Sequence, residues 1–254
     1  MSRLYIGPIE IRLNGTGYSH FLTQYDFGPF ARKRPVERTI ELTFGEKHDV
    51  RLDVASFIYR RHDLSFIAHE RRCLAWVSGD ISGFLACLEL ALFIGVSQLG
   101  GVLMHASVGV LDDEAWLMPG PSGTGKSTAI NGGFDRILSD ERVILVKEHR
   151  GYRVWGTPFW SDGRCWPLDV SSGVLAGIIK LVQSPTLARC ELDRIEMIEW
   201  VMRSVIMYGE SAVNADDLMT FVVHMVDSTE RIQVSFPKEG LWATSMLSQI
   251  GLAS

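Results

Sequence analysis

Eight consecutive residues carry the pattern with the clearest chemistry in this chain. Residues 120–127 read Gly-Pro-Ser-Gly-Thr-Gly-Lys-Ser and match G-x-x-x-x-G-K-[ST] without a mismatch. Glycines permit positive φ and a close approach of the backbone to an anion, so successive N–H groups can converge on phosphate oxygens. Lys126 adds a cation that can reach the β- and γ-phosphates, and Ser127 offers a hydroxyl to Mg²⁺. The pattern predicts a nucleotide phosphate site formed by Gly120, Pro121, Ser122, Gly123, Thr124, Gly125, Lys126, Ser127 and Thr128. The alternative is a glycine-rich turn with a surface lysine.

An acidic pair follows this loop. Asp140 and Glu141 end a short apolar stretch, and Asp140 comes fourteen residues after Lys126. A carboxylate in such a place can hold the metal or activate the attacking group of a phosphoryl transfer. The alternative is a solvated surface turn.

The elements that must position these residues can be read from the apolar pattern. Residues 102–108 and 115–118 are expected to be buried strands, the second leading directly into the glycine-rich loop, and residues 128–131 a short helix. Residues 1–79 are β-rich, with strands expected over 4–13, 38–44, 50–59 and 64–77. Helices are expected over 82–96 and 192–207, and further strands over 134–139, 153–156, 178–182, 221–226 and 232–236.

Composition limits the class of protein. The chain has 254 residues, 46% hydrophobic and 22% charged, which is typical of a folded globular protein. With a formal charge of −5, the protein has no overall positive potential that would attract the phosphate backbone of a nucleic acid. No nucleic-acid partner is therefore expected. We expect no secretory signal, since the first thirty residues lack a basic start followed by an apolar run, and no membrane span, since no apolar run is long enough for a bilayer. The four scattered cysteines form no zinc pattern. We therefore expect a cytoplasmic protein without a membrane partner.

Four segments together resemble a known family. They are Met-His-Ala-Ser at 104–107, the glycine-rich loop, Ile-Leu-Ser-Asp-Glu at 137–141 and Tyr-Arg-Val-Trp-Gly-Thr-Pro-Phe at 152–159. They look like the catalytic core of HPr kinase/phosphorylase relatives, and more specifically like the HPr-kinase-like serine kinases found with peptide-modification genes. The resemblance covers residues 105–159 well. It implies an α/β fold, a P-loop kinase core of HPr-kinase type with a mixed central sheet over residues 80–254, after a β-rich N-terminal region over residues 1–79.

The resemblance also implies roles for individual residues. Asp140, His105 and Lys126 form the catalytic set, with Asp140 as the base and His105 hydrogen-bonded to that carboxylate or to the acceptor. Ser127 and Glu141 contact Mg²⁺, directly or through water, and the roles of Asp140 and Glu141 could be exchanged. The family has Asp where this chain has Glu141. For His105 the alternative is a satisfied core histidine.

The expected activity follows from these roles. The chain would transfer the γ-phosphoryl group of ATP, with Mg²⁺, to a serine hydroxyl of a peptide or protein, a ribosomal peptide precursor included. The Arg-Gly-Leu-Gly segment associated with the reverse phosphorolysis is not found in the sequence. Two alternatives remain: a P-loop protein that binds nucleotide without transferring phosphate, and a kinase of a small hydroxylated metabolite. The oligomeric state is left open, a homo-oligomer included.

An aromatic run follows the acidic pair and has two interpretations. It is either the edge of the core or a pocket for the acceptor or the nucleobase. Its members are Tyr152, Trp155, Phe159, Trp160 and Trp166, with Arg153 and Arg164 among them.

Overall fold

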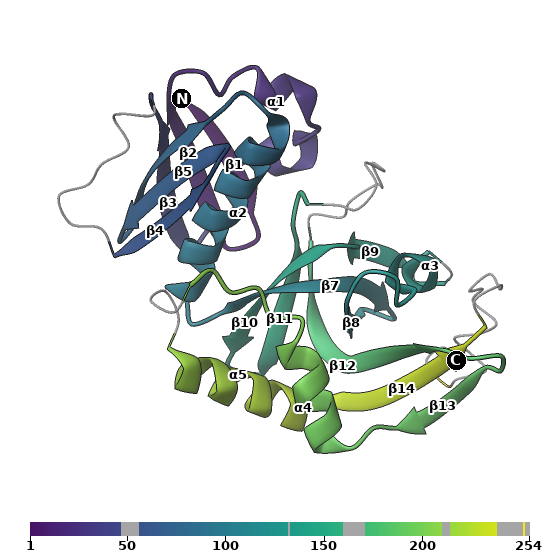
Figure 1. Ribbon diagram of the computed structural model, residues 1–254. Coiled ribbons are helices and arrows are strands. Elements are labelled where there is room, and N and C mark those ends of the chain that lie inside the picture. Colours follow the sequence, from purple (N-terminus) through teal and green to yellow (C-terminus); the bar gives the residue numbers. More distant parts are fainter. Residues whose placement is uncertain (47–55, 132, 160–170, 210–213, 238–250, 252–254) are drawn as a thin grey trace. The chain divides into compact units, whose positions relative to one another are not determined.

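The computed structural model describes the chain except residues 47–55, 132, 160–170, 210–213, 238–250 and 252–254 (Figure 1). The chain divides into two compact units, which are described separately. The first comprises Met1–Gly101 and Met207–Ala215, and the second comprises Val102–Ile206 and Asp216–Ser254. Each is built on one mixed sheet with few helices, so the expected mixed α/β class is confirmed.

The first unit contains a six-stranded sheet in the order β1-β2-β3-β6-β5-β4. Two of the expected strands are hairpins, because a residue with positive φ turns the chain within each: Gly7 (φ 55°) and Glu70 (φ 50°). The strands are β1 Ser2–Ile6, β2 Ile9–Gly15, β3 Arg38–Phe44, β4 Phe57–Arg61, β5 Leu64–His69 and β6 Arg72–Val77. The short helix α1 Phe21–Gln24 and a 3₁₀ helix, Gly28–Ala31, lie between β2 and β3.

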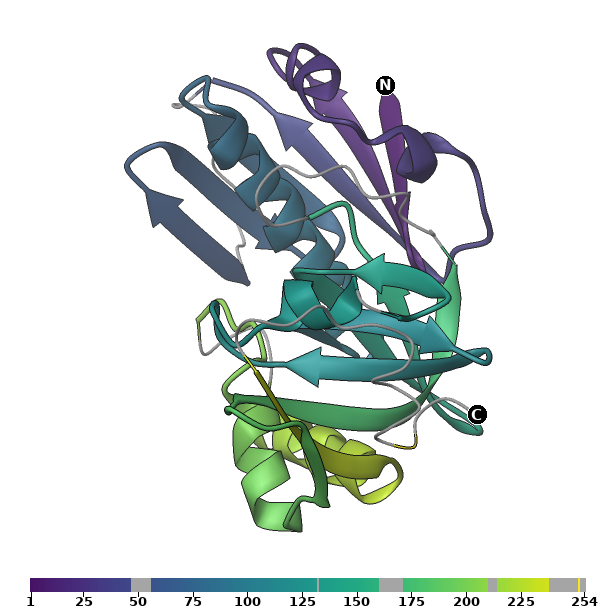
Figure 2. The same cartoon turned by 90° about the vertical axis from the view of Figure 1, so that its right-hand side faces the viewer.

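Helix α2, Ile81–Ser97, packs on the sheet of the first unit (Figure 2). It begins at Asp80, whose side chain accepts a hydrogen bond from the amide of Ser82. Its residue Gly95 lies so close to the sheet that a Cβ there would stand 3.1 Å from side-chain atoms of Ile9 and Ile40. The division between the units therefore lies after α2, whereas the sequence suggested a boundary after residue 79.

The second unit contains an eight-stranded sheet in the order β11-β10-β7-β8-β12-β14-β13, with β9 also paired to β7. Strand β12 pairs with β11 near its start, so this part of the sheet curls back on itself. The strands are β7 Val102–Leu111, β8 Glu114–Pro119, β9 Arg136–Ser139, β10 Arg142–Glu148, β11 Gly151–Gly156, β12 Ser172–Gln183, β13 Ala188–Glu191 and β14 Glu230–Phe236. The sequence pattern predicted neither β10 nor β13.

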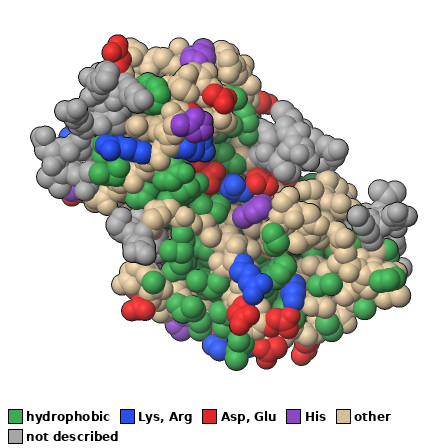
Figure 3. Space-filling view, in the orientation of Figure 1, with side chains coloured by type: hydrophobic (Ala, Val, Ile, Leu, Met, Phe, Trp, Pro, Cys, Tyr) green, Lys and Arg blue, Asp and Glu red, His purple; other side chains and the backbone are tan. Residues whose placement is uncertain are grey.

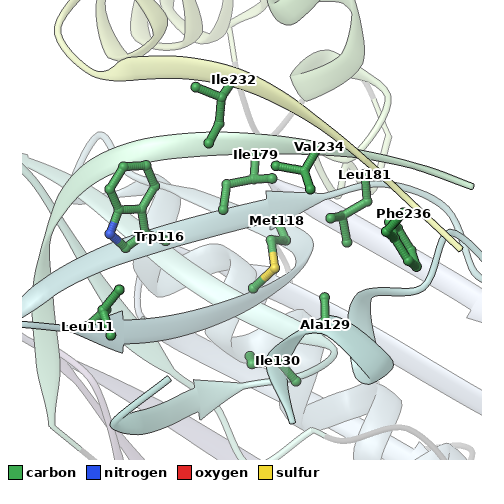
Figure 4. Close-up of a cluster of buried hydrophobic side chains, with 10 residues drawn as sticks. All are labelled: Leu111, Trp116, Met118, Ala129, Ile130, Ile179, Leu181, Ile232, Val234 and Phe236. Carbon is green, nitrogen blue, oxygen red and sulfur yellow. The ribbon is translucent and has the colours of Figure 1, made fainter. Parts of the chain in front are cut away.

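The strands β8, β12 and β14 run parallel to one another, so their carboxyl ends meet at one edge of the sheet. Ligands of open α/β sheets bind at such an edge. A cluster of buried apolar side chains lies beneath it and joins the three strands to the helix after the loop (Figure 4). Its buried members are Leu111, Trp116, Met118, Ala129, Ile130, Ile179, Leu181, Ile232, Val234 and Phe236.

Three helices complete the second unit: α3 Lys126–Ile130, α4 Arg194–Met202 and α5 Ala215–Asp227. The expectation of a strand over residues 221–226 is wrong, because this stretch lies within α5. Leu218, Phe221, Val222 and Met225 recur at helical spacing and form its buried face. The apolar residues of 221–226 taken alone are compatible with a buried strand, and the helical spacing becomes evident only together with Leu218.

Candidate functional site

The glycine-rich loop, residues 120–127, connects the carboxyl end of β8 to α3. Gly123 (φ 85°) and Gly125 (φ 96°) have left-handed backbone conformations, which residues with a Cβ rarely adopt. Gly125 also packs against Phe236 of β14, where a Cβ would come within 2.4 Å of the ring. Glycine at position 125 is therefore required both by the backbone conformation and by the available space.

The amides of the loop are left without backbone partners. Among the backbone hydrogen bonds of the described residues outside the helices and strands, none is donated by the amides at 123–127, whereas the amide of Ala129 donates to the carbonyl of Gly125 at 2.9 Å. The loop carbonyls, in contrast, accept from side chains, including Pro121, which accepts from Thr124 Oγ1 at 3.0 Å. Polar groups of a backbone need partners. The loop thus offers donors, rather than acceptors, to a ligand.

Lys126 is buried beside these donors, with 5% of its surface exposed. Its Nζ donates to the carbonyls of Gly120 at 2.7 Å and Pro121 at 2.9 Å. Burial lowers the pKa of Lys126, as does the charge of Arg142, whereas Glu141 and Asp140 act in the opposite direction. The amine of Lys126, a residue near the end of the loop, is therefore held by two carbonyls at the start of the loop.

The acidic pair lies at the turn between β9 and β10, and strand β7 fixes its backbone. Ser107 Oγ donates to the carbonyl of Asp140 at 3.0 Å, and the amide of Ala106 donates to the carbonyl of Glu141 at 3.2 Å. On the other side of β7, Ala106 is the register partner of Pro119, where the loop begins. The acidic pair and the loop therefore flank the same residue of β7.

The carboxylate of Glu141 is held at both oxygens. His105 Nε2 lies 3.3 Å from Oε2, and Arg142 Nη1 donates to Oε1. Burial alone would raise the pKa of Glu141, but the hydrogen bond with His105 and the charge of Arg142 outweigh it and bring the pKa from 4.5 to about 2. Glu141 is therefore an anion with a fixed orientation.

These groups surround one pocket of about 380 Å³. It is lined by His105, Ser122, Gly123, Gly125, Lys126, Ser127, Thr128, Asp140, Glu141, Gln183 and Phe236. All the residues predicted for catalysis or metal binding are brought together there, and Asp140 is 3% exposed. Of the residues predicted to bind nucleotide, Gly120, Pro121 and Thr124 do not line the pocket.

The donor set at this pocket fits Mg²⁺. Ser127, Asp140 and Glu141 supply oxygen ligands, which Mg²⁺ prefers, and Mg²⁺ in proteins is bound by one or two carboxylates together with substrate phosphates and waters. Among the described residues, no group of three or more His, Cys, Asp or Glu side chains is arranged to hold a metal ion. Because both oxygens of Glu141 already have partners, a contact through water would leave its present arrangement intact.

Four residues that contact the loop or the acidic pair were not predicted from the sequence. Arg142 contacts Glu141, Gln183 Nε2 donates to the carbonyl of Gly123 at 2.9 Å, and Phe236 packs against Gly125. Trp200 of α4 donates from Nε1 to the carbonyl of Pro119 at 2.9 Å. Arg142 had a local signal, since it directly follows the acidic pair, but the other three are brought to the loop by the order of distant strands and by α4.

Part of the aromatic run belongs to the hydrophobic core, the first of its two interpretations. Tyr152 is buried, with its ring centroid 5.0 Å from that of Phe221 of α5, and Phe159 is buried as well. None of these side chains lines the pocket described above. Trp160, Arg164 and Trp166 lie outside the described residues.

No protein-family model matches the chain, and no curated protein matches it. In the part of the chain with described structure, no helix combines the length and apolar character needed to cross a membrane. On the face shown in Figure 3, Lys and Arg side chains lie among Asp and Glu.

Proposed function

We propose that the chain is a Mg²⁺-dependent kinase of the HPr kinase/phosphorylase-like type that transfers the γ-phosphoryl group of ATP to a hydroxyl of a peptide or protein. The observation that carries the proposal is the composition of the pocket. One wall is a loop whose amides lack backbone partners, with a buried lysine, and another carries the buried carboxylate of Asp140. Phosphoryl transfer requires both a phosphate cradle and a base near the acceptor.

The loop amides and Lys126 would bind the β- and γ-phosphates. Lys126 already directs its amine at the loop carbonyls of Gly120 and Pro121, so phosphate oxygens in the pocket would add acceptors for the same amine. Ser127 and Glu141 would hold Mg²⁺, Glu141 through a water molecule, which leaves Asp140 available to the acceptor. When bound, the metal neutralises charge on the phosphate oxygens.

Asp140 would act as the general base. The acceptor oxygen forms a bond to the γ-phosphorus, the bond from that phosphorus to the β,γ-bridging oxygen breaks, and ADP leaves with the electron pair of the broken bond. The hydroxyl proton passes to the carboxylate of Asp140 and from there to solvent. Glu141 would keep His105 in one orientation through the Nε2 contact, which makes His105 suited to orient the acceptor.

The experiment uses a library of short peptides, each with one serine, and a matched set with that serine replaced by alanine. The chain is incubated with Mg-ATP, and mass spectrometry detects peptides that gain a phosphate. Asp140→Asn should reduce transfer about 10²- to 10⁴-fold, the usual contribution of a general base, while the affinity for ADP stays unchanged. Asp113→Asn is the control, since that carboxylate is 99% exposed at the other end of β8.

The outcomes separate the alternatives. Transfer by Asp140→Asn at the wild-type rate would show that this carboxylate is not the base. Binding of Mg-ATP without phosphate on any serine peptide would contradict peptide kinase activity; a parallel incubation with a set of small hydroxylated metabolites then distinguishes a metabolite kinase from a nucleotide-binding protein that transfers nothing.

A further inference from the structure

A side chain far from the glycine-rich loop in sequence holds the middle of this loop. Gln183 is the last residue of β12, and its Nε2 donates to the carbonyl of Gly123 at 2.9 Å. The Gln183 side chain is exposed and lines the pocket. Its place is set by the sheet, because β12 runs parallel to β8 and therefore ends at the edge where the loop begins.

The hydrogen bond fixes the orientation of a whole peptide group, and not of its carbonyl alone. In a planar trans peptide the C=O and the following N–H point in opposite directions. Holding the carbonyl of Gly123 therefore also sets the direction of the Thr124 amide. Gly123 is the residue at which this peptide could most easily turn, since its φ is 85° and no other atom lies within 4 Å of the position that a Cβ would take.

The loop is contacted by other side chains near its start and near its end. Trp200 donates to the carbonyl of Pro119, and its ring lies 3.0 Å from where a Cβ of Gly120 would stand. Phe236, the register partner of Gln183 on β14, packs against Gly125. Gly123 lies between Gly120 and Gly125 in the loop. Among the described residues, the side chain from another element that holds it is Gln183.

We propose that Gln183 is a positioning residue of the phosphate site, which keeps the loop amides in their binding arrangement before the ligand arrives. The proposal rests on the proposed function in one respect, namely that the ligand is an oligophosphate. A loop already ordered in the free protein loses less conformational freedom on binding, so the ligand binds more tightly. Gln183 need not touch the phosphates to have this effect.

The variant Gln183→Met tests the proposal, because methionine keeps the length of the side chain and removes the donor. Gln98→Met is the matched control. Gln98 is also an exposed glutamine whose Nε2 donates to a distant backbone carbonyl, that of Glu70 at 2.7 Å, but it belongs to the first unit. A general effect of losing such a bond would appear in both variants.

The first measurement is ¹⁵N relaxation of the Gly123 and Gly125 amides in glycine-labelled protein without ligand. In the wild type and in Gln98→Met, the order parameter of Gly123 should be near ~0.85, and in Gln183→Met it should fall below ~0.6. The second is calorimetric titration with pyrophosphate alone. Gln183→Met should bind it about fivefold to tenfold more weakly, the usual effect of one hydrogen bond, with a melting temperature equal to that of Gln98→Met.

Two results would overturn the proposal: an equally rigid Gly123 in Gln183→Met, or a loosened Gly123 with unchanged pyrophosphate affinity in a chain whose wild type binds pyrophosphate. A wild type that binds neither pyrophosphate nor Mg-ATP contradicts the proposed function instead. In that case the relaxation of Gly123 alone decides whether Gln183 holds the loop.

Discussion

His105 of β7 and Arg142 of β10 are register partners on neighbouring strands, and both contact the carboxylate of Glu141. Register partners in an antiparallel pair project to the same face of a sheet. The carboxylate is therefore held between a histidine and an arginine whose relative position is fixed by strand pairing rather than by a loop. The orientation of this carboxylate in the pocket therefore follows from the register of β7 and β10.

Glu141 should make the free energy of unfolding depend on pH in the acidic range. Its pKa is lowered from 4.5 to about 2 in the folded protein, so the stabilisation is complete above pH 4.5 and is lost as the pH falls towards 2. Glu141→Gln should be less stable than the wild type by about 2 kcal/mol at pH 7, because two partners lose a charged acceptor. The difference should shrink between pH 4.5 and 2, as measured by urea unfolding at several pH values.

Other carboxylates also titrate in this range, so the comparison needs a control. Glu114→Gln removes an exposed carboxylate at the start of β8. Its pH profile should run parallel to that of the wild type. A Glu141→Gln profile that is also parallel would contradict the assigned pKa.

The sequence was sufficient where the signal is local. The glycine-rich loop, the short helix after it and the strand before it depend on neighbouring residues. Asp140 is indicated by the acidic pair that ends an apolar stretch shortly after the loop, and His105 by a resemblance that extends over a short segment. Gln183, Trp200 and Phe236 could not be found in this way, since they reach the loop only through the parallel order β8-β12-β14 and the return of α4. A single sequence contains no signal for these long-range pairings.

Two substitutions in the glycine-rich loop should differ in their cost. Gly123→Ala meets no atom within 4 Å, so only the left-handed backbone opposes it, at roughly 1–2 kcal/mol. Gly125→Ala has the same backbone cost and also places a Cβ 2.4 Å from the ring of Phe236, which adds about 1–3 kcal/mol of overpacking. Thermal unfolding should therefore show the lower melting temperature for Gly125→Ala.

A second substitution tests the reason for this difference. In the Gly125→Ala background, Phe236→Leu should recover part of the lost stability, because the smaller side chain makes room for the Cβ. In the wild-type background the same change should only destabilise, since Phe236 is buried in the cluster beneath the loop. If Phe236→Leu lowered the melting temperature equally in both backgrounds, the contact with Phe236 would not be the cause.

The thiols should differ sharply in reactivity. Burial raises the pKa of Cys73 to about 12 and raises that of Cys87 as well, whereas Cys190 on β13 is exposed. Because the thiolate is the reactive form, iodoacetamide at pH 8 should alkylate Cys190 in the native protein and reach Cys73 and Cys87 only after unfolding in urea. Peptide mapping by mass spectrometry measures each site separately. Native alkylation of Cys73 would show that the sheet of the first unit opens readily.

Lys126→Met should separate the charge of the buried lysine from its packing. Methionine fills a similar volume, but the cation and its bonds to Gly120 and Pro121 are lost, and Thr124 Oγ1 remains the donor to Pro121. Hydrogen bonds to charged groups contribute about 1.5–3 kcal/mol, so pyrophosphate should bind roughly tenfold to a hundredfold more weakly. Lys147→Met, which removes an exposed lysine of β10, should bind as the wild type does.

The pH dependence of binding makes the same test sharper. Because burial lowers the pKa of Lys126 below 10.5, the amine loses its proton at a lower pH than an exposed lysine. Pyrophosphate affinity of the wild type, measured by calorimetry, should therefore begin to fall before pH 10.5 is reached, while the weak binding by Lys126→Met should not change in this range. An equal decline in both proteins would show that some group other than Lys126 supplies the charge that holds the phosphates.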